Sequence, residues 1–195
     1  DAQAPCQTPL LVVQVGPKHE VTMTESVFDC RMCGHCCQGQ GGIVVSVPER
    51  ERLADFLGMT VEDFCARHTE VQGKKLVLRC GENGYCVFFD PRTACTVHPA
   101  KPDVCRAWPF FRGNLADAVS WELAQEYCPG IRPECGHAEF ARVGISYLVD
   151  NRLTKTGRED EANALRIADL TEKICCACPN AMPCWKSLPA LPWTR

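Results

Sequence analysis

The sequence has no long apolar stretch and no block of like charge. No window reaches about 18 consecutive apolar residues, so no transmembrane segment is expected. The 195 residues include 21 basic and 24 acidic side chains, with a formal net charge of −3 and no polybasic run. This balance argues against a nucleic acid or an anionic membrane as a partner. The longest apolar run near the start, Leu10 to Val13, is too short for a signal-peptide core.

The common catalytic motifs are also missing. The sequence contains no phosphate-binding G-x-x-x-x-G-K-[ST] loop, no dinucleotide-binding G-x-G-x-x-G and no nucleophile elbow. The five histidines form no H-E-x-x-H motif, and we interpret His35 and His98, which lie near cysteines, as hydrogen-bond donors rather than ligands. We therefore expect a protein without substrate chemistry of its own.

Cysteine is the residue that is abundant, with 16 in the chain. Disulfide-dense domains are usually shorter than about 80 residues, and cysteines crowded onto one short loop rarely have the geometry for a disulfide. Thiolates in such a loop repel one another unless a cation neutralises them. We therefore favour metal binding over a disulfide framework, which implies a reducing compartment, most simply the cytoplasm.

Hydrophobic periodicity predicts an α+β fold of short antiparallel strands and several helices, with irregular loops wrapped around metal centres. Helices are expected from Pro48 to Leu57, from Thr60 onward, along the apolar stripe Phe140 to Leu148, and from about Glu159 to Cys175. Cys65 falls on the apolar face of the second helix, so we expect it to be a core residue. Strands are expected at 10–15, 43–47, 74–79 and 85–89, with the last two forming a hairpin around 81–84.

Three cysteines in register give the most specific local signal. Cys30-x-x-Cys33-x-x-Cys36 has the spacing of the first three ligands in a bacterial ferredoxin loop. A zinc knuckle ordinarily takes two cysteines from one turn and two from another. Consecutive side chains diverge in an extended segment, so Cys36 and Cys37 are expected to serve different centres, unless one is a hydrogen-bonded thiol beside a centre.

Later cysteines lie in distinctive surroundings: Cys86-Val87-Phe88-Phe89-Asp90, Cys95-Thr96-Val97-His98-Pro99, Lys101-Pro102-Asp103-Val104-Cys105-Arg106-Ala107-Trp108-Pro109-Phe110 and Cys128-Pro129-Gly130-Ile131. Over about residues 28 to 131 this pattern resembles the YkgJ-type cysteine-cluster family, which has a CxxCxxCC signature and is described as zinc- or iron-chelating. Lys101 stands where that family usually has arginine. The resemblance implies a cysteine-bound metal, and a methylase among the relatives carries an iron–sulfur cluster.

We accordingly divide the chain into an extended lead-in (1–27), a cysteine-cluster metal-binding domain (28–131) and a helical extension with a second cysteine group (132–195). The predicted ligands are Cys30, Cys33, Cys36, Cys37, Cys86, Cys95, Cys105, Cys128, Cys175, Cys176, Cys178 and Cys184. Aromatic side chains near these cysteines would exclude water from a cluster; they are Phe88, Phe89, Trp108, Phe110 and Phe111. Nearby arginines would offset the negative charge of a cluster; they are Arg31, Arg79, Arg106 and Arg112.

The leading functional hypothesis is an iron–sulfur protein with two or more clusters, most simply of the 4Fe–4S type, that transfers electrons or senses redox state. It would work with a redox protein partner, in the cytoplasm and without membrane insertion. The alternatives are a zinc- or iron-binding module with a structural or metal-handling role, and an enzyme whose cluster supports transfer chemistry, by analogy with the methylase relative.

Overall fold

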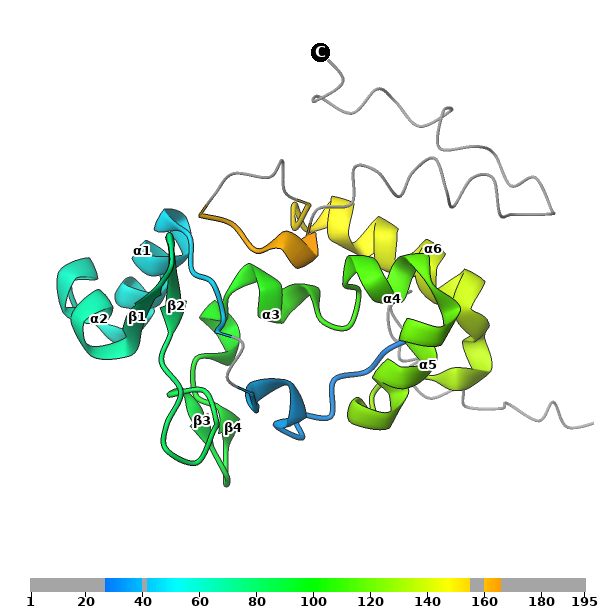
Figure 1. Cartoon of the computed structure of the whole chain (residues 1–195), viewed down its shortest axis with the longest axis horizontal. Coiled ribbons are helices and arrows are strands. Elements are labelled where there is room, and N and C mark those ends of the chain that lie inside the picture. The colour runs from blue at the N-terminus through cyan, green and yellow to red at the C-terminus, as the bar shows by residue number, and fades with distance from the viewer. Residues whose placement is uncertain (1–26, 40–41, 155–159, 166–195) are drawn as a thin grey trace, which may run out of the picture.

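The computed structural model describes residues 27–39, 42–154 and 160–165 (Figure 1). These residues confirm the predicted α+β class. The helices are α1 (Val47–Leu57), α2 (Val61–His68), α3 (Asp103–Ala107), α4 (Arg112–Ala116), α5 (Ala118–Tyr127) and α6 (Gly136–Asp150). The strands are β1 (Thr69–Gln72), β2 (Lys75–Leu78), β3 (Phe89–Asp90) and β4 (Ala94–Cys95), and short 3-10 turns lie at His35–Cys37, His98–Ala100, Pro133–Cys135 and Asn163–Leu165.

The predicted helix of 48–57 is confirmed with a start one residue earlier, at Val47, and both ends of its loop to α2 are confirmed. Ser46 and Glu49 form a capping box at the start of α1, and Gly58 ends the helix in a left-handed conformation. Thr60 caps α2, because its hydroxyl accepts a hydrogen bond from the Asp63 backbone N–H at 3.1 Å. The apolar stripe of 140–148 is also confirmed, since α6 buries Phe140, Ala141, Val143, Gly144 and Leu148.

The predicted hairpin of 74–79 with 85–89 is wrong. β2 instead pairs antiparallel with β1, in a register that runs from Thr69 opposite Leu78 to Gln72 opposite Lys75. This pairing leaves a loop of only two residues, so it costs less chain entropy than the predicted one. The 81–84 turn is retained but brings together only one bridged pair, Cys80 and Cys86, while β3 pairs with β4.

The predicted strand over 43–47 is also wrong. Val44 makes a single bridge to Val77, and Ser46 already caps α1, so the helix begins where the strand was expected to end. The strand predicted over 10–15 lies outside the described residues. The helix predicted from about Glu159 to Cys175 is described only over 160–165, where Asn163–Leu165 form a 3-10 turn.

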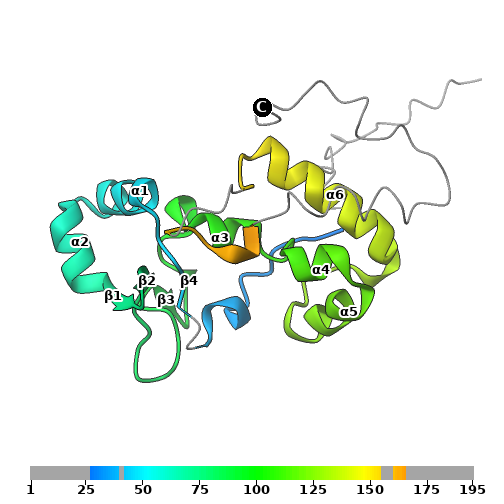
Figure 2. The same ribbon diagram turned by 45° about the horizontal axis from the view of Figure 1, so that its top comes forward.

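The helices form two groups, α1 with α2 and α4 with α5 and α6 (Figures 1 and 2), and each group has its own hydrophobic core. The first, which we call the α1–α2 core, contains Leu53, Phe64, Leu78, Phe88 and Val97. The second, the α4–α6 core, is built around the following buried side chains: Phe110, Leu115, Trp121, Phe140 and Leu148. Helix α3 and the segment 27–39 lie between the two groups of helices (Figure 1).

The residues before the first cysteine cluster pair with those after Cys128. Phe28 and Ile131 form an antiparallel bridge, and the Asp29 N–H donates to the Gly130 carbonyl at 2.9 Å. The two backbones approach so closely that a Cβ on Gly130 would lie 2.3 Å from the Asp29 carbonyl oxygen. This contact brings the two ends of the cysteine-rich stretch side by side. None of the helices in the described ranges is long and apolar enough to cross a membrane.

Candidate metal centre

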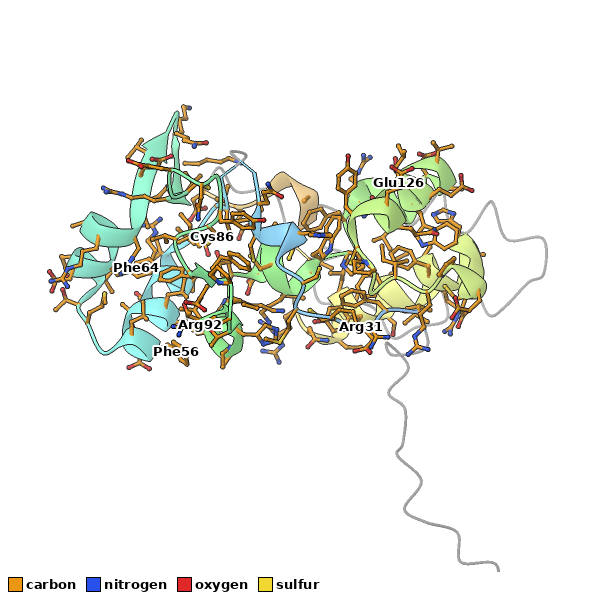
Figure 3. The ribbon with its side chains drawn as sticks, turned by 90° about the horizontal axis from the view of Figure 1, so that it is seen from below. Arg31, Phe56, Phe64, Cys86, Arg92 and Glu126 are labelled. Atoms are coloured by element: carbon orange, nitrogen blue, oxygen red, sulfur yellow. The ribbon has the colours of Figure 1, made fainter. Side chains whose placement is uncertain are left out.

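A cavity of about 470 Å³ lies between the two cores, and nine cysteines line it. They are Cys30, Cys33, Cys36, Cys37, Cys80, Cys86, Cys95, Cys105 and Cys128. Figure 3 shows Cys86 between the half that contains Phe64 and the half that carries Glu126. All eight of the predicted ligands that fall within the described residues therefore reach one cavity, although their ligand role stays a prediction. Cys175, Cys176, Cys178 and Cys184 lie outside the described residues, as does Cys6.

The first cysteine cluster is held by contacts from both sides of the cavity. Gly34 has φ of +81° and packs so tightly on the Phe89 ring that an added Cβ would lie 2.3 Å from Cε2. His35 donates through Nδ1 to the Tyr127 carbonyl, at 2.8 Å, at the end of α5. The hydrogen-bond role predicted for His35 is thus confirmed.

The geometric argument for Cys36 and Cys37 had a wrong premise. Residues His35–Cys37 form a 3-10 turn rather than an extended segment, and the Cys37 thiol hydrogen-bonds to Cys36. This hydrogen bond lowers the pKa of Cys36 to about 6 and raises the pKa of Cys37. The two sulfurs are therefore neighbours, and their assignment to different centres stays a prediction without support from diverging side chains.

Three of the cavity sulfurs accept a backbone N–H from the residue two positions further along the chain. The donors are Phe88 for Cys86, Val97 for Cys95 and Gly130 for Cys128. Cys128 accepts a second hydrogen bond from the Trp108 indole. Hydrogen bonds of this kind stabilise thiolate over thiol, which is the form that a metal binds.

Burial opposes these hydrogen bonds. It raises the pKa of Cys86, Cys95, Cys105 and Cys128, and the negative charges of the other cavity cysteines raise the pKa of all four further. As thiolates, these cysteines would therefore repel one another electrostatically. A cation among them would remove both the repulsion and the cost of burying a thiolate.

Lys101 is the cation at the cavity wall with the widest electrostatic effect on the thiols. Its charge lowers the pKa of Cys36, Cys95 and Cys105, against a larger opposing effect of burial on all three. Its ammonium donates to His98 Nε2 at 3.2 Å. His98 accepts this hydrogen bond through Nε2, while a donor role for its Nδ1 stays a prediction.

The four arginines predicted to offset charge divide into two pairs. Arg31 and Arg79 line the cavity, but Arg31 pairs with Asp29 at 3.2 Å and Arg79 donates to backbone carbonyls at the end of α2. Arg106 and Arg112 are not among the lining residues. Of the predicted aromatic residues, Phe88, Trp108 and Phe111 line the cavity, whereas Phe110 is buried in the α4–α6 core.

Two lining residues were missed as functional residues by the sequence reasoning. Lys101 was noted only as a departure from the usual arginine, although its position between Cys95 and Cys105 pointed to the site. Cys80 has no motif around it, and only its pairing with Cys86 reveals its place. Cys65 and Cys135 do not line the cavity; Cys65 packs on the α1–α2 core, as predicted.

Within the described ranges, no three cysteine, histidine, aspartate or glutamate side chains converge closely enough to hold a single metal ion. The thiols are distributed around the cavity instead. The donor set still fits a metal chemically, because soft thiolates are the ligands that zinc and iron–sulfur clusters prefer.

No solved structure is significantly similar to this chain. Residues 29–129, more than half of the sequence, match the family model CxxCxxCC, described as "Putative zinc- or iron-chelating domain". This range begins and ends where the two backbone segments pair at Asp29 and Gly130, and it contains all nine cavity cysteines. The chain therefore belongs to the CxxCxxCC family of zinc- or iron-chelating domains.

Proposed function

We propose that this protein holds iron–sulfur clusters and uses them to transfer single electrons or to sense redox state. The cavity ligands would be the eight cysteines of the matched pattern: Cys30, Cys33, Cys36, Cys37, Cys86, Cys95, Cys105 and Cys128. Eight thiolates suffice for two sites of four, and the C-terminal group Cys175, Cys176, Cys178 and Cys184 would supply a further one. A bound cluster supplies reversible one-electron chemistry.

The observation that carries the proposal is the convergence of nine thiols on one cavity. Its volume of about 470 Å³ is roughly fifteen times the ~30 Å³ that one water occupies in the liquid. A single ion needs far less room, and a tetrahedral zinc with bonds of about 2.3 Å needs its sulfurs drawn tightly together. A polynuclear cluster suits widely distributed thiols better.

The hydrogen bonds to sulfur support the same assignment. Backbone N–H donors to Cys86, Cys95 and Cys128, and the Trp108 indole, would all stabilise negative charge on a cluster. Such hydrogen bonds, together with burial, set the reduction potential of an iron–sulfur centre. Phe88, Trp108 and Phe111 would keep water from the sulfurs, and Lys101 would offset part of the cluster charge.

The exposed side of the cavity indicates where a redox partner would approach. Electron transfer requires close approach of a second redox protein, and several of the cluster-loop residues, including Cys30, Cys33 and Cys36, are exposed. We expect the partner to approach on this exposed side.

The test is purification of the full chain without oxygen, followed by analysis of iron, acid-labile sulfide and zinc. The proposal expects a brown protein with broad visible absorption, in which iron and sulfide are present in similar amounts. A colourless protein with stoichiometric zinc and no sulfide would contradict it and would favour a structural or metal-handling zinc module.

A further inference from the structure

Cys80 and Cys86 face each other across an antiparallel bridge. The hydrogen bonds lie on either side of the pair: the Val87 N–H donates to the Arg79 carbonyl at 3.0 Å, and the Gly81 N–H donates to the Tyr85 carbonyl at 2.7 Å. This arrangement makes Cys80 and Cys86 a non-hydrogen-bonded pair, whose Cα atoms lie about 4.5 Å apart with both side chains on one face. That separation is within the range that a disulfide spans.

The turn between the two cysteines keeps them in register. The Gly84 N–H donates to the Gly81 carbonyl at 2.9 Å, and the Tyr85 N–H donates to Asn83 Oδ1 at 3.1 Å. Both cysteines are free thiols that line the cavity. Burial raises the pKa of Cys86, and the charge of Cys80 is among the groups that raise it further, which is consistent with close approach.

Cys80 also has no role in the proposed ligand set. It is the ninth thiol at a cavity where the matched pattern supplies eight, and its Sγ donates to the Gly39 carbonyl at 3.3 Å. A thiol held beside a ligand, without being one, is placed to react with that ligand when oxidant arrives.

We infer that Cys80 and Cys86 form a reversible disulfide when peroxide reaches the cavity, and that this bond withdraws Cys86 from the metal. The pair is thus a modification site that couples oxidation to metal release. The effect on the metal rests on Cys86 being a ligand, as proposed above, whereas the disulfide itself does not.

The chemistry balances with hydrogen peroxide as the oxidant. One thiol attacks peroxide, so that the O–O bond breaks, an S–O bond forms and water leaves, giving a sulfenic acid. The second thiol attacks that sulfur, the S–O bond breaks, the S–S bond forms and a second water leaves. Two thiols lose two electrons and two protons in total, and one peroxide becomes two waters. Where Cys86 starts as a metal-bound thiolate, its bond to the metal breaks and solvent supplies the proton that it lacks.

The bond should be easy to reverse. A Cα separation of about 4.5 Å is at the short end of the disulfide range, and disulfides away from the preferred geometry are more readily reduced. Labile disulfides of this type are those used for regulation. A small thiol reductant should therefore regenerate both cysteines.

The sequence offers a direct test, because trypsin cleavage after Arg79 and Arg92 releases a peptide whose two cysteines are Cys80 and Cys86. The metal-loaded full chain is treated with stoichiometric hydrogen peroxide, and its remaining thiols are blocked with N-ethylmaleimide. The protein is then digested with trypsin, and the peptide masses are measured by mass spectrometry. We expect this peptide unlabelled and two hydrogens lighter, restored by dithiothreitol, with metal released in parallel. A doubly labelled peptide, or Cys86 linked to a different peptide, would overturn the inference.

Two variants separate the switch from metal binding. Cys80→Ser should bind metal as the wild type does. After peroxide treatment it should form no disulfide within the tryptic peptide that contains Cys86, and it should retain its metal. Cys65→Ser removes a thiol outside the cavity and should match the wild type in metal content and in its response to peroxide. If Cys80→Ser is isolated without metal, Cys80 is a ligand and the inference is overturned. If the wild type carries no metal, the proposed function fails, while the mass of the peptide still decides whether the disulfide forms.

Discussion

Gly34 is the residue of the cluster loop with the least room for change. Its φ of +81° costs an L-residue about 1–2 kcal/mol, and an added methyl group would overlap the Phe89 ring. Gly34→Ala should therefore destabilise the loop by at least this amount and lower the metal content. Gly113→Ala is the matched control, because nothing lies within 4 Å of its added Cβ. Urea unfolding and metal analysis of both variants test this, and equal stability would contradict it.

Trp108 provides a way to alter one hydrogen bond to sulfur without removing a ligand. Trp108→Phe keeps an aromatic ring against Phe111 but removes the N–H that donates to Cys128. Loss of a hydrogen-bonding partner around a metal ligand typically costs about 10- to 100-fold in metal affinity. If the metal is an iron–sulfur cluster, the reduction potential should also fall, because the reduced cluster loses a donor. Metal competition measures the affinity and potentiometric titration measures the reduction potential. Unchanged values in Trp108→Phe would show that the hydrogen bond to Cys128 does not affect the site.

Cys105 and Cys65 differ in role although both are cysteines on helices. Cys105 lies on α3 and lines the cavity, whereas Cys65 packs on the α1–α2 core. Cys105→Ser should lose metal and stability together, because metal binding supplies folding free energy in such domains. Cys65→Ala should keep its full metal content. Elemental analysis beside thermal unfolding would separate the two, and metal loss in the Cys65 variant would show that this helix is wrongly interpreted.

At the scale of elements, α1 fixes the start of α3 and thereby the position of Cys105. The Glu49 carboxylate is buried; it accepts the Asp103 N–H at 2.6 Å through Oε1 and the Ser46 N–H at 2.7 Å through Oε2. Arg52, one turn further, donates to the Lys101 carbonyl at 3.1 Å and pairs with Asp103 at 3.0 Å. Two residues of one helix therefore hold the segment that carries Lys101 into the cavity wall.

Glu49→Gln tests this link with minimal change of shape. The amide cannot accept on both sides at once, so a buried N–H loses its charged partner, at a cost of about 1.5–3 kcal/mol. Glu51→Gln makes the same change on the exposed side of α1 and should stay within about 0.5 kcal/mol of the wild type. Chemical denaturation measures both. A small effect at Glu49 would show that α3 is held by its apolar contacts alone.

Elements with strong end signals could be predicted from the sequence, whereas strand partners could not. Thr60, Gly58 and the apolar stripe of α6 act locally, so their patterns are visible along the chain. The pairing of β2 was misjudged because strand partners compete, and the shorter loop to Thr69–Gln72 wins over the glycine-rich turn after Cys80.

The candidate site shows the same division between local and long-range information. Spacing and neighbouring residues identified eight cysteines that do reach one cavity, because each lies in a recognisable local motif. Cys80 and Lys101 owe their importance to contacts across the fold, with Cys86 and with three cavity thiols. The hydrogen bond between Cys36 and Cys37 depended on a 3-10 turn that the spacing alone did not indicate.

For the whole molecule, the cavity is the junction of two cores that each bury their own side chains. The cavity is lined by Phe88 and Val97 from the α1–α2 core and by Cys128 from the α4–α6 core. The hydrogen bond between Asp29 and Gly130 joins the two ends of the cysteine-rich stretch. A metal bound here would join the two halves. The stability of the whole chain should therefore depend on conditions that favour thiolates.

Metal retention should consequently depend steeply on pH. Burial raises the pKa of Cys86, Cys95, Cys105 and Cys128, so without metal these groups are thiols at neutral pH, whereas Cys36, with a pKa of about 6, is already largely thiolate. Protons compete with metal at each raised thiol, and each such thiol changes the apparent affinity about tenfold per pH unit. The affinity should therefore fall as the pH drops from about 8 to 6.

Competition of the metal-loaded full chain against a chelator, measured across this pH range, gives the slope of affinity against pH. Once the slope is corrected for the chelator's own protonation, a metal held by these four thiols predicts a slope of about four in logarithmic units, and Cys37, whose pKa is also raised, adds to the slope if it binds the same metal. Cys65→Ala should give the same slope, since its sulfur does not line the cavity. A slope near zero would mean that the buried thiols do not exchange protons for metal, and the assignment of these four cysteines as ligands would then be wrong.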